Sequence, residues 1–172
     1  MKNYLVASAA ALLVSTSVSA QDMTGFYGGI AVGTGDVDTN VGVTGDGESF
    51  GAFVGYNYDF SGFVVGGELD IDNTDYALTG GAGSIDQTTR LKLRGGANLG
   101  GGLAYVTVGA VRAETSDLGD DSGRFFGIGY DYMITDNIMI GGEYLRHDFE
   151  GFDGSAIDVD VDTFKLRVGF KF

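Results

Sequence analysis

The sequence predicts an all-β protein, an eight-stranded antiparallel up-and-down transmembrane β-barrel. Three observations support this fold class: an export signal precedes the body of the chain, eight segments of that body alternate apolar and polar side chains, and the connections between segments alternate between short and long. The composition agrees, because 31 glycines, no proline and 44% hydrophobic residues argue against both a collagen-like and a disordered chain. The absence of cysteine excludes disulfides and thiolate metal sites.

Residues 1–20 have the pattern of a secretory signal peptide. Lys2 supplies a positive charge, an apolar run follows, and small residues precede a cleavage site between Ala20 and Gln21. The apolar run is much shorter than the about 20 residues that a membrane-spanning helix needs. We therefore expect a signal peptide at 1–20 and a single β-barrel domain at 21–172.

Eight segments of the domain alternate with the period of two that is typical of β-strands. The C-terminal segment is the clearest, because its odd-numbered positions include charged residues and its even-numbered positions are Phe164, Leu166, Val168, Phe170 and Phe172. The other apolar faces, in chain order, are Phe26-Ile30-Val32, Phe50-Ala52-Val54-Tyr56-Tyr58, Phe63-Val65-Leu69-Ile71, Leu91-Leu93-Ala97-Leu99, Leu103-Tyr105-Val111, Phe126-Ile128-Tyr130-Tyr132 and Ile138-Ile140-Tyr144.

The connections predict an up-and-down order of strands. Short turns are expected at 59–62, 98–102 and 134–137. Longer loops are expected near 36–47, 72–87, 115–123 and 149–161. A single alternating strand would suit a soluble β-sandwich equally well. Eight such strands behind an export signal favour a barrel whose apolar faces meet lipid and whose polar faces line the interior.

Charged side chains lie on the strand faces opposite the large apolar ones, so we expect them to line the lumen. The predicted lumenal network consists of Glu68, Asp70, Arg90, Lys92, Arg94, Arg112, Glu114, Glu143, Lys165 and Arg167. Hairpin pairing should place Glu68 and Asp70 near Arg90 and Lys92. Glu143 should similarly meet Arg167. Because side chains can fill the interior of an eight-stranded barrel, we interpret the charges as a salt-bridge network; a gated ion path is the alternative.

The stretch from Gly127 to Phe149 resembles the sixth and seventh strands of small eight-stranded outer-membrane β-barrels, the OmpA-like, porin-family surface antigens of alphaproteobacterial type. Further similar features are Gly25-Phe26-Tyr27-Gly28-Gly29, Gly55-Tyr56-Asn57-Tyr58 and the terminal Phe172. The resemblance implies a place in the Gram-negative cell outer membrane. It also implies that the barrel-assembly machinery reads the C-terminal strand through Phe164, Leu166, Val168, Phe170 and Phe172. Outer-membrane lipid, lipopolysaccharide and periplasmic chaperones are the other implied partners.

The chain departs from the family in having no tryptophan. Tyrosine and phenylalanine should therefore form the aromatic girdle at the periplasmic side. The residues expected there are Tyr56, Tyr58, Phe63, Tyr105, Tyr130, Tyr132, Phe170 and Phe172. No peptidoglycan-binding domain is expected after Phe172.

The net charge of −14 comes mainly from the expected long loops, and it makes nucleic-acid binding improbable. Carboxylates such as Asp36 and Asp38 could bind divalent cations shared with lipopolysaccharide phosphates. A calcium loop starting at Asp36 would need glycine at 41 and glutamate at 47, where the chain has Val41 and Gly47. Solvated acidic loops are the preferred interpretation, and we assign no metal or cofactor residue.

Catalysis has little support in the sequence. His147 is the single histidine and is expected at the outer rim, while Ser122 and Ser155 fall in expected loops without a nucleophile motif. We therefore assign no catalytic residue and expect a structural, envelope-integrity role with surface-exposed loops. A narrow porin-like channel for ions or small solutes is the alternative, and a lipid-modifying outer-membrane enzyme is a distant third.

Overall fold

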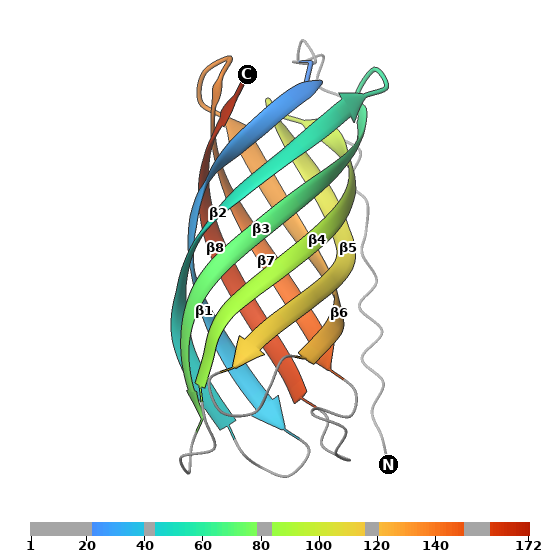
Figure 1. The fold of residues 1–172 in the computed structure, drawn as a ribbon. Helices are drawn as coiled ribbons and strands as arrows, with labels where there is room; N and C mark the ends of the chain where they lie inside the picture. The colour runs from blue at the N-terminus through green and yellow to red at the C-terminus, as the bar shows by residue number, and fades with distance from the viewer. Residues whose placement is uncertain (1–21, 40–43, 79–83, 116–120, 150–158) are drawn as a thin grey trace.

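The structure is a computed structural model that describes residues 22–39, 44–78, 84–115, 121–149 and 159–172. Eight strands make up nearly all of these residues, and they wind around the barrel at a steep tilt (Figure 1). Their bounds are β1 Gly25–Thr39, β2 Thr44–Asp59, β3 Phe63–Leu78, β4 Ser84–Leu99, β5 Gly102–Thr115, β6 Asp121–Met133, β7 Ile138–Phe149 and β8 Val159–Lys171. The expected signal peptide and the cleavage site after Ala20 lie outside the described residues.

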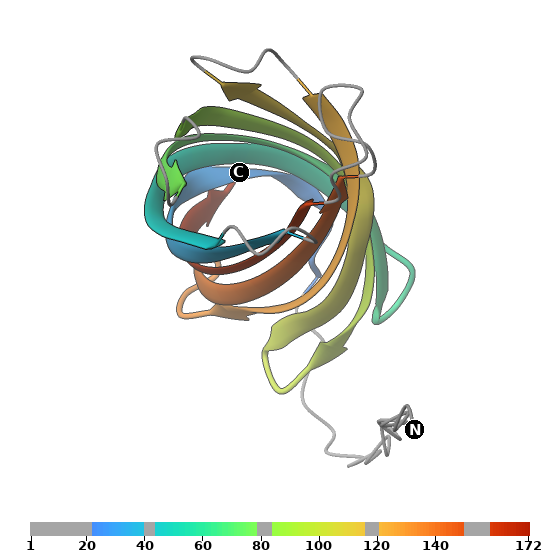
Figure 2. The same cartoon turned by 90° about the horizontal axis from the view of Figure 1, so that it is seen from below.

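Each strand pairs antiparallel with its neighbours in the sequence, and β1 pairs with β8 to close the barrel. Seen along its axis, the sheet forms a continuous ring (Figure 2). The closing pair extends from Tyr27 opposite Lys171 to Thr39 opposite Val159. The predicted fold class and strand order are therefore confirmed. Within the described residues, no helix is long and apolar enough to cross a membrane.

The three short turns lie where the sequence predicts them, between β2 and β3, β4 and β5, and β6 and β7. In the first, the amide of Gly62 donates a hydrogen bond of 2.6 Å to Oδ1 of Asp59. In the second, Gly100 and Gly101 have φ angles of 62° and 86°. Two consecutive positive φ angles suit a two-residue hairpin turn and favour glycine at both positions. These turns and the C-terminus share one end of the barrel, called the short-turn end here (Figure 1).

The connections at the opposite end, the long-loop end, are shorter than the sequence predicts. β3 continues to Leu78 and β4 begins at Ser84, so most of the expected loop 72–87 is strand. β1 and β2 likewise extend into the expected loop 36–47. Polar residues occupy both strand faces there, so the apolar alternation that marks the lipid-crossing part disappears although the hydrogen-bonded ladder continues.

The outer face of the barrel is apolar, as predicted. The five alternate C-terminal residues are all exposed: Phe164, Leu166, Val168, Phe170 and Phe172. Aromatic side chains gather on the outer face toward the short-turn end, which agrees with the expected girdle for Tyr56, Tyr58, Phe63, Tyr130, Tyr132, Phe170 and Phe172. Tyr105 is the exception, because its side chain lies inside the barrel with 4% exposure.

The prediction for β5 was wrong about which face meets lipid. Leu103, Tyr105 and Val111 are buried in the interior, while Val106 and Val108 point outward. Both faces of this strand carry large apolar or aromatic side chains, so hydrophobicity alone could not identify the lumenal face. The error reverses the expected orientation of every side chain on the strand.

Many inward aromatic rings lie over a glycine on the neighbouring strand. The directly opposed pairs are Tyr27 with Gly55, Phe53 with Gly29, Tyr105 with Gly129, and Phe125 with Gly109. In each pair, a Cβ atom on the glycine would collide with the ring. The glycines therefore make space for large side chains in a narrow lumen, which adds to the curvature role expected from the sequence.

Candidate functional site: the lumenal charge network

The lumenal charge network begins on the β3–β4 hairpin, where alternation turns three acidic and three basic side chains inward. Glu68 is directly opposite Lys92, and Asp70 is directly opposite Arg90. This register is the pairing that the sequence predicts. All four side chains are buried, so each charged group has lost its hydration and must be stabilised by partners in the barrel.

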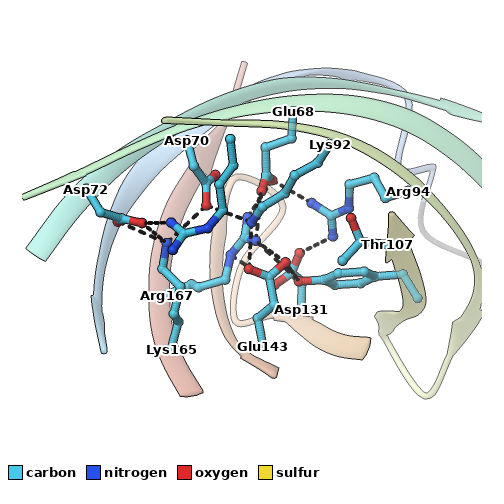
Figure 3. Close-up of polar contacts among 12 residues, drawn as sticks. Glu68, Asp70, Asp72, Lys92, Arg94, Thr107, Asp131, Glu143, Lys165 and Arg167 are labelled. Atoms are coloured by element: carbon cyan, nitrogen blue, oxygen red, sulfur yellow. Dashed lines mark hydrogen bonds and ion pairs between the residues drawn. The ribbon is translucent and has the colours of Figure 1, made fainter. Parts of the chain in front are cut away.

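Lys92 occupies the centre of the network (Figure 3). Its Nζ lies 3.1 Å from Oε1 of Glu68, 2.6 Å from Oδ2 of Asp70 and 2.6 Å from Oε2 of Glu143. One oxygen from each carboxylate lies within 4.8 Å of the others, a spacing that could hold a metal ion. The ammonium of Lys92 already supplies the positive charge at this position, so the cluster is an ion-pair cage.

Two arginines extend the network toward the short-turn end. Arg167 places Nη2 2.6 Å from Oε2 of Glu68 and Nη1 3.1 Å from Oε1 of Glu143, which is the predicted Glu143 contact. Arg94 places Nη2 2.5 Å from Oδ2 of Asp131 and Nη1 2.9 Å from Oε2 of Glu68. Its guanidinium also stacks 3.7 Å from the ring centroid of Tyr105. Both arginines therefore bind carboxylates from more than one strand.

The ion pairs of Lys165 and Arg90 extend the network toward the long-loop end. Nζ of Lys165 lies 3.0 Å from Oδ2 of Asp70 and 2.8 Å from Oδ2 of Asp72. Asp72 also binds Nη1 of Arg90. Nε of Arg90 donates a hydrogen bond of 2.8 Å to Nε2 of His147. These contacts join β3, β4, β7 and β8 across the lumen.

The buried charges in the described part of the chain balance. Five are acidic and five are basic: Glu68, Asp70, Asp72, Asp131 and Glu143 against Arg90, Lys92, Arg94, Lys165 and Arg167. A balanced, mutually paired set presents no excess charge to attract a counter-ion. This arrangement suits a structural network better than a selectivity filter, which uses rings of one sign of charge.

Apolar side chains pack against the network from both ends of the barrel, and some lie at the level of the charges, as Phe53 does opposite Asp70 and Val111 opposite Arg90. Toward the short-turn end, a buried cluster contains Met23, Tyr27, Ala31, Phe53, Val64, Leu103, Tyr105, Met133 and Met139. Toward the long-loop end, the buried apolar residues are Val37, Val111, Phe125, Leu145 and Val161. The same half also holds the buried polar residues Ser49, Thr74, Thr88 and Thr163, so the described lumen is a packed core in which ion pairs, apolar side chains and hydroxyls are mixed.

Most of the predicted network residues meet in this core, but Arg112 does not. It is exposed and shares the outward face of β5 with Val106 and Val108. Arg112 was assigned to the lumen because the prediction chose the wrong face of β5 as the lipid-facing one. Glu114 is on the same strand, and its side chain lies outside the part that the structure describes.

Two acidic residues and one histidine of the network were missed by the sequence prediction: Asp72, Asp131 and His147. Each lies an even number of residues from another inward-facing residue of its strand. Continuing the alternation to the ends of the strands would therefore have placed all three in the lumen. Asp72 was assigned to a loop and His147 to the rim. His147 does lie near the long-loop end of β7, but its side chain is 1% exposed and points into the lumen.

The outer surface near the long-loop end carries both signs of charge. Asp36, Asp46, Glu48 and Asp160 are exposed on β1, β2 and β8. Arg146 on β7 contacts Asp160 at 3.3 Å. These acidic residues are therefore strand residues facing outward. Of the two carboxylates suggested for divalent cations, Asp36 is among them, and the side chain of Asp38 lies outside the described part of the chain.

Comparison with known proteins supports the architecture. The protein-family model of the outer membrane protein β-barrel domain matches residues 6–172 of the chain. No curated protein sequence matches the chain. The structure of Neisserial surface protein A is similar, with 15% identity, a TM-score of 0.62, and coverage of 87% of this chain and 98% of that protein.

A second similar structure is Ail, the attachment invasion locus protein of Yersinia pestis. It is 19% identical with a TM-score of 0.54, and the match covers 87% of this chain and 100% of that protein. At such low identity, both likenesses concern the fold alone.

Proposed function

This chain belongs to the outer membrane protein β-barrel family, and from that premise we propose that it is a structural, surface-exposed component of the outer membrane and not a solute pore. One observation carries the proposal: the described lumen is filled by a balanced ion-pair network with apolar side chains packed around it. A diffusion pore needs an open, continuous polar path, and mutually paired, buried charges in a packed lumen oppose one.

We expect the refolded barrel to give no steady conductance in planar lipid bilayers, because the paired charges and apolar clusters fill the lumen. The measurement is single-channel recording, with an open porin in the same bilayer as a positive control. Steady ion-selective conductance would contradict the structural proposal and support the narrow-channel alternative. In that case Arg90→Ala should abolish it, while the matched change Arg146→Ala, on the outer face, should not.

The proposal includes no enzymatic activity. Both ring nitrogens of His147 are engaged, Nε2 by Arg90 and Nδ1 by the backbone oxygen of Val161 at 3.0 Å. Ser122 is exposed on the opposite face of the wall, the outer face of β6. Acyl transfer by a serine would require the histidine within hydrogen-bond reach of that hydroxyl.

The proposal also assigns lipopolysaccharide as a partner of the outer surface. Arg112, Arg124 and Arg146 lie on the outward faces of β5, β6 and β7, three neighbouring strands. On each strand the arginine lies nearer the long-loop end than the apolar outward residues do. The three arginines therefore lie where lipid tails give way to headgroups. Guanidinium groups bind phosphate oxygens in bidentate geometry, and outward carboxylates on β1, β2 and β8 could share divalent cations with other phosphates.

The triple variant R112Q/R124Q/R146Q is expected to bind lipopolysaccharide severalfold more weakly, because three phosphate contacts are lost. The measurement is the amount of lipopolysaccharide retained by the barrel purified in mild detergent. Lys171→Gln is the matched control, since Lys171 lies at the opposite end of the barrel and should retain native binding. Equal retention by the triple variant and the native protein would exclude these arginines as the binding surface.

A further inference from the structure

His147 connects two sides of the lumen near the long-loop end, and its hydrogen bonds require a neutral ring. We propose that His147 and Arg90 form an acid-sensitive latch: the neutral imidazole holds Arg90 in place, and uptake of a proton by the ring releases it. The inference concerns conformational stability and is independent of the structural role proposed above.

The hydrogen bonds assign the tautomer. A backbone oxygen can only accept, so Nδ1 of His147, 3.0 Å from the oxygen of Val161, must carry the ring hydrogen. An arginine can only donate, so Nε2, 2.8 Å from Nε of Arg90, must be the acceptor. Together these two contacts leave no position for a second proton on the imidazole.

The surroundings also oppose a charged ring. His147 is 1% exposed, and Phe125 on β6 lies against it with ring centroids 5.5 Å apart. The cations named in this part of the lumen are Arg90 and Lys92 on β4 and Lys165 on β8, so a charged ring would lie among like charges.

The carboxylates near the latch already serve other cations. On β3, Asp72 binds Arg90 and Lys165, and Asp70 binds Lys92 and Lys165. On β7 itself, Glu143 binds Lys92. A proton on His147 would therefore add a positive charge to a network whose described charges balance.

Protonation of His147 would set two donors against each other at 2.8 Å, one on Nε2 and one on Nε of Arg90. One side chain would have to move. Arg90 joins β4 to β7 through His147 and to β3 through Asp72, so its displacement would loosen the long-loop half of the lumen. The contact between Lys92 and Glu143 would still hold β4 and β7 together deeper in the barrel.

The sign of the pH effect follows from proton linkage. In the unfolded chain a histidine takes up a proton near pH ~6.5, whereas the latched ring stays neutral. Below that pH the unfolded state binds more protons than the folded state, so stability falls as the pH falls. The unfolding equilibrium constant should rise about tenfold per pH unit until the folded ring is itself protonated and Arg90 is released.

The test compares the native barrel with His147→Gln, whose side-chain oxygen can still accept from Arg90 but does not titrate. Unfolding in urea is measured in detergent micelles at pH 7.5 and pH 5.0. The shared effect of carboxylate titration cancels in the comparison. Acidification should increase the unfolding constant of the native barrel about thirtyfold more than that of the variant. An equal pH response of the two proteins would overturn the latch.

Ring nitrogen NMR of the native barrel supplies a second measurement that does not depend on the variant folding. The latch requires the neutral tautomer with hydrogen on Nδ1 at pH 7.5, and it requires this form to persist at pH 6. A ring that is charged at pH 7.5, or that titrates with a midpoint near pH 6.5, would overturn the proposal even if His147→Gln failed to refold.

Discussion

Replacing Lys92 with methionine is expected to lower the free energy of unfolding by about 3–5 kcal/mol, the cost typical of removing one partner from a buried ion-pair network. The ammonium of Lys92 lies within 3.1 Å of carboxylate oxygens of Glu68, Asp70 and Glu143. Without it, three negative charges would face one another with only Arg94, Arg167 and Lys165 to compensate. Methionine keeps an unbranched apolar stem, so the change tests the charge more than the volume.

The measurement is the urea unfolding midpoint of refolded barrels in detergent micelles. Lys171→Met is the matched control, because Lys171 donates to the backbone oxygen of Asp22 at the exposed short-turn end. This control should change stability by no more than about 0.5 kcal/mol. A Lys92→Met barrel as stable as the control would show that the central ammonium is not needed to balance the carboxylates.

Calcium binding provides a second test of the role of Lys92. The three carboxylates of the cage offer oxygens within 4.8 Å of one another, and hard cations prefer such ligands. Once Lys92 is removed, millimolar calcium should raise the unfolding midpoint of the variant and leave the native barrel unchanged. Calcium stabilisation of the native barrel to the same extent would show that the ion binds elsewhere.

The network could be predicted from the sequence wherever one strand face was clearly polar. β3 and β4 each place charges at every second position opposite large aliphatic residues, so both the face and the register of Glu68 with Lys92 followed from alternation and hairpin geometry. The same pattern placed Lys165 and Arg167 inside. Here one face must meet lipid, and that requirement leaves a single choice of orientation.

The prediction failed where that contrast was missing. On β5, Tyr105 was assigned to the lipid interface because aromatic residues are common there, yet its hydroxyl lies 3.1 Å from Oε1 of Glu143 in the lumen. Asp131 lies between two outward tyrosines, so its single charge did not mark a polar face. A lumen in which aromatic rings stack on guanidinium groups has no purely polar face, and a hydrophobicity pattern cannot find the inward side of such a strand.

Glycine is the feature whose meaning the structure changes most. From composition, its abundance indicated only that the sheet could bend and close. In the structure, glycines also stand directly opposite large inward side chains, as Gly51 does for Asp72 and Gly141 for Asp131. A Cβ atom at either glycine would meet the facing carboxylate. Glycine therefore sets how much charge and how many rings the narrow lumen can hold.

Gly129→Ala is expected to destabilise the barrel by about 1–3 kcal/mol, the usual cost of forcing additional volume into a packed core. The added methyl would lie where the ring of Tyr105 now packs, with Cε1 of the ring only 2.9 Å away. The ring cannot easily yield, because Arg94 stacks on it at 3.7 Å and its hydroxyl contacts Glu143 at 3.1 Å. Displacing Tyr105 would therefore disturb the charge network as well as the packing.

Gly95→Ala is the matched control for this prediction. Gly95 is also a strand glycine, but a Cβ atom there would meet nothing within 4 Å. Both variants lose the same backbone freedom in the unfolded chain, so their difference isolates the lumenal clash from the general effect of replacing glycine. Urea unfolding of the two barrels should show Gly129→Ala clearly less stable than Gly95→Ala. If both variants shifted the midpoint equally, glycine at 129 would serve backbone conformation and not the space that Tyr105 occupies.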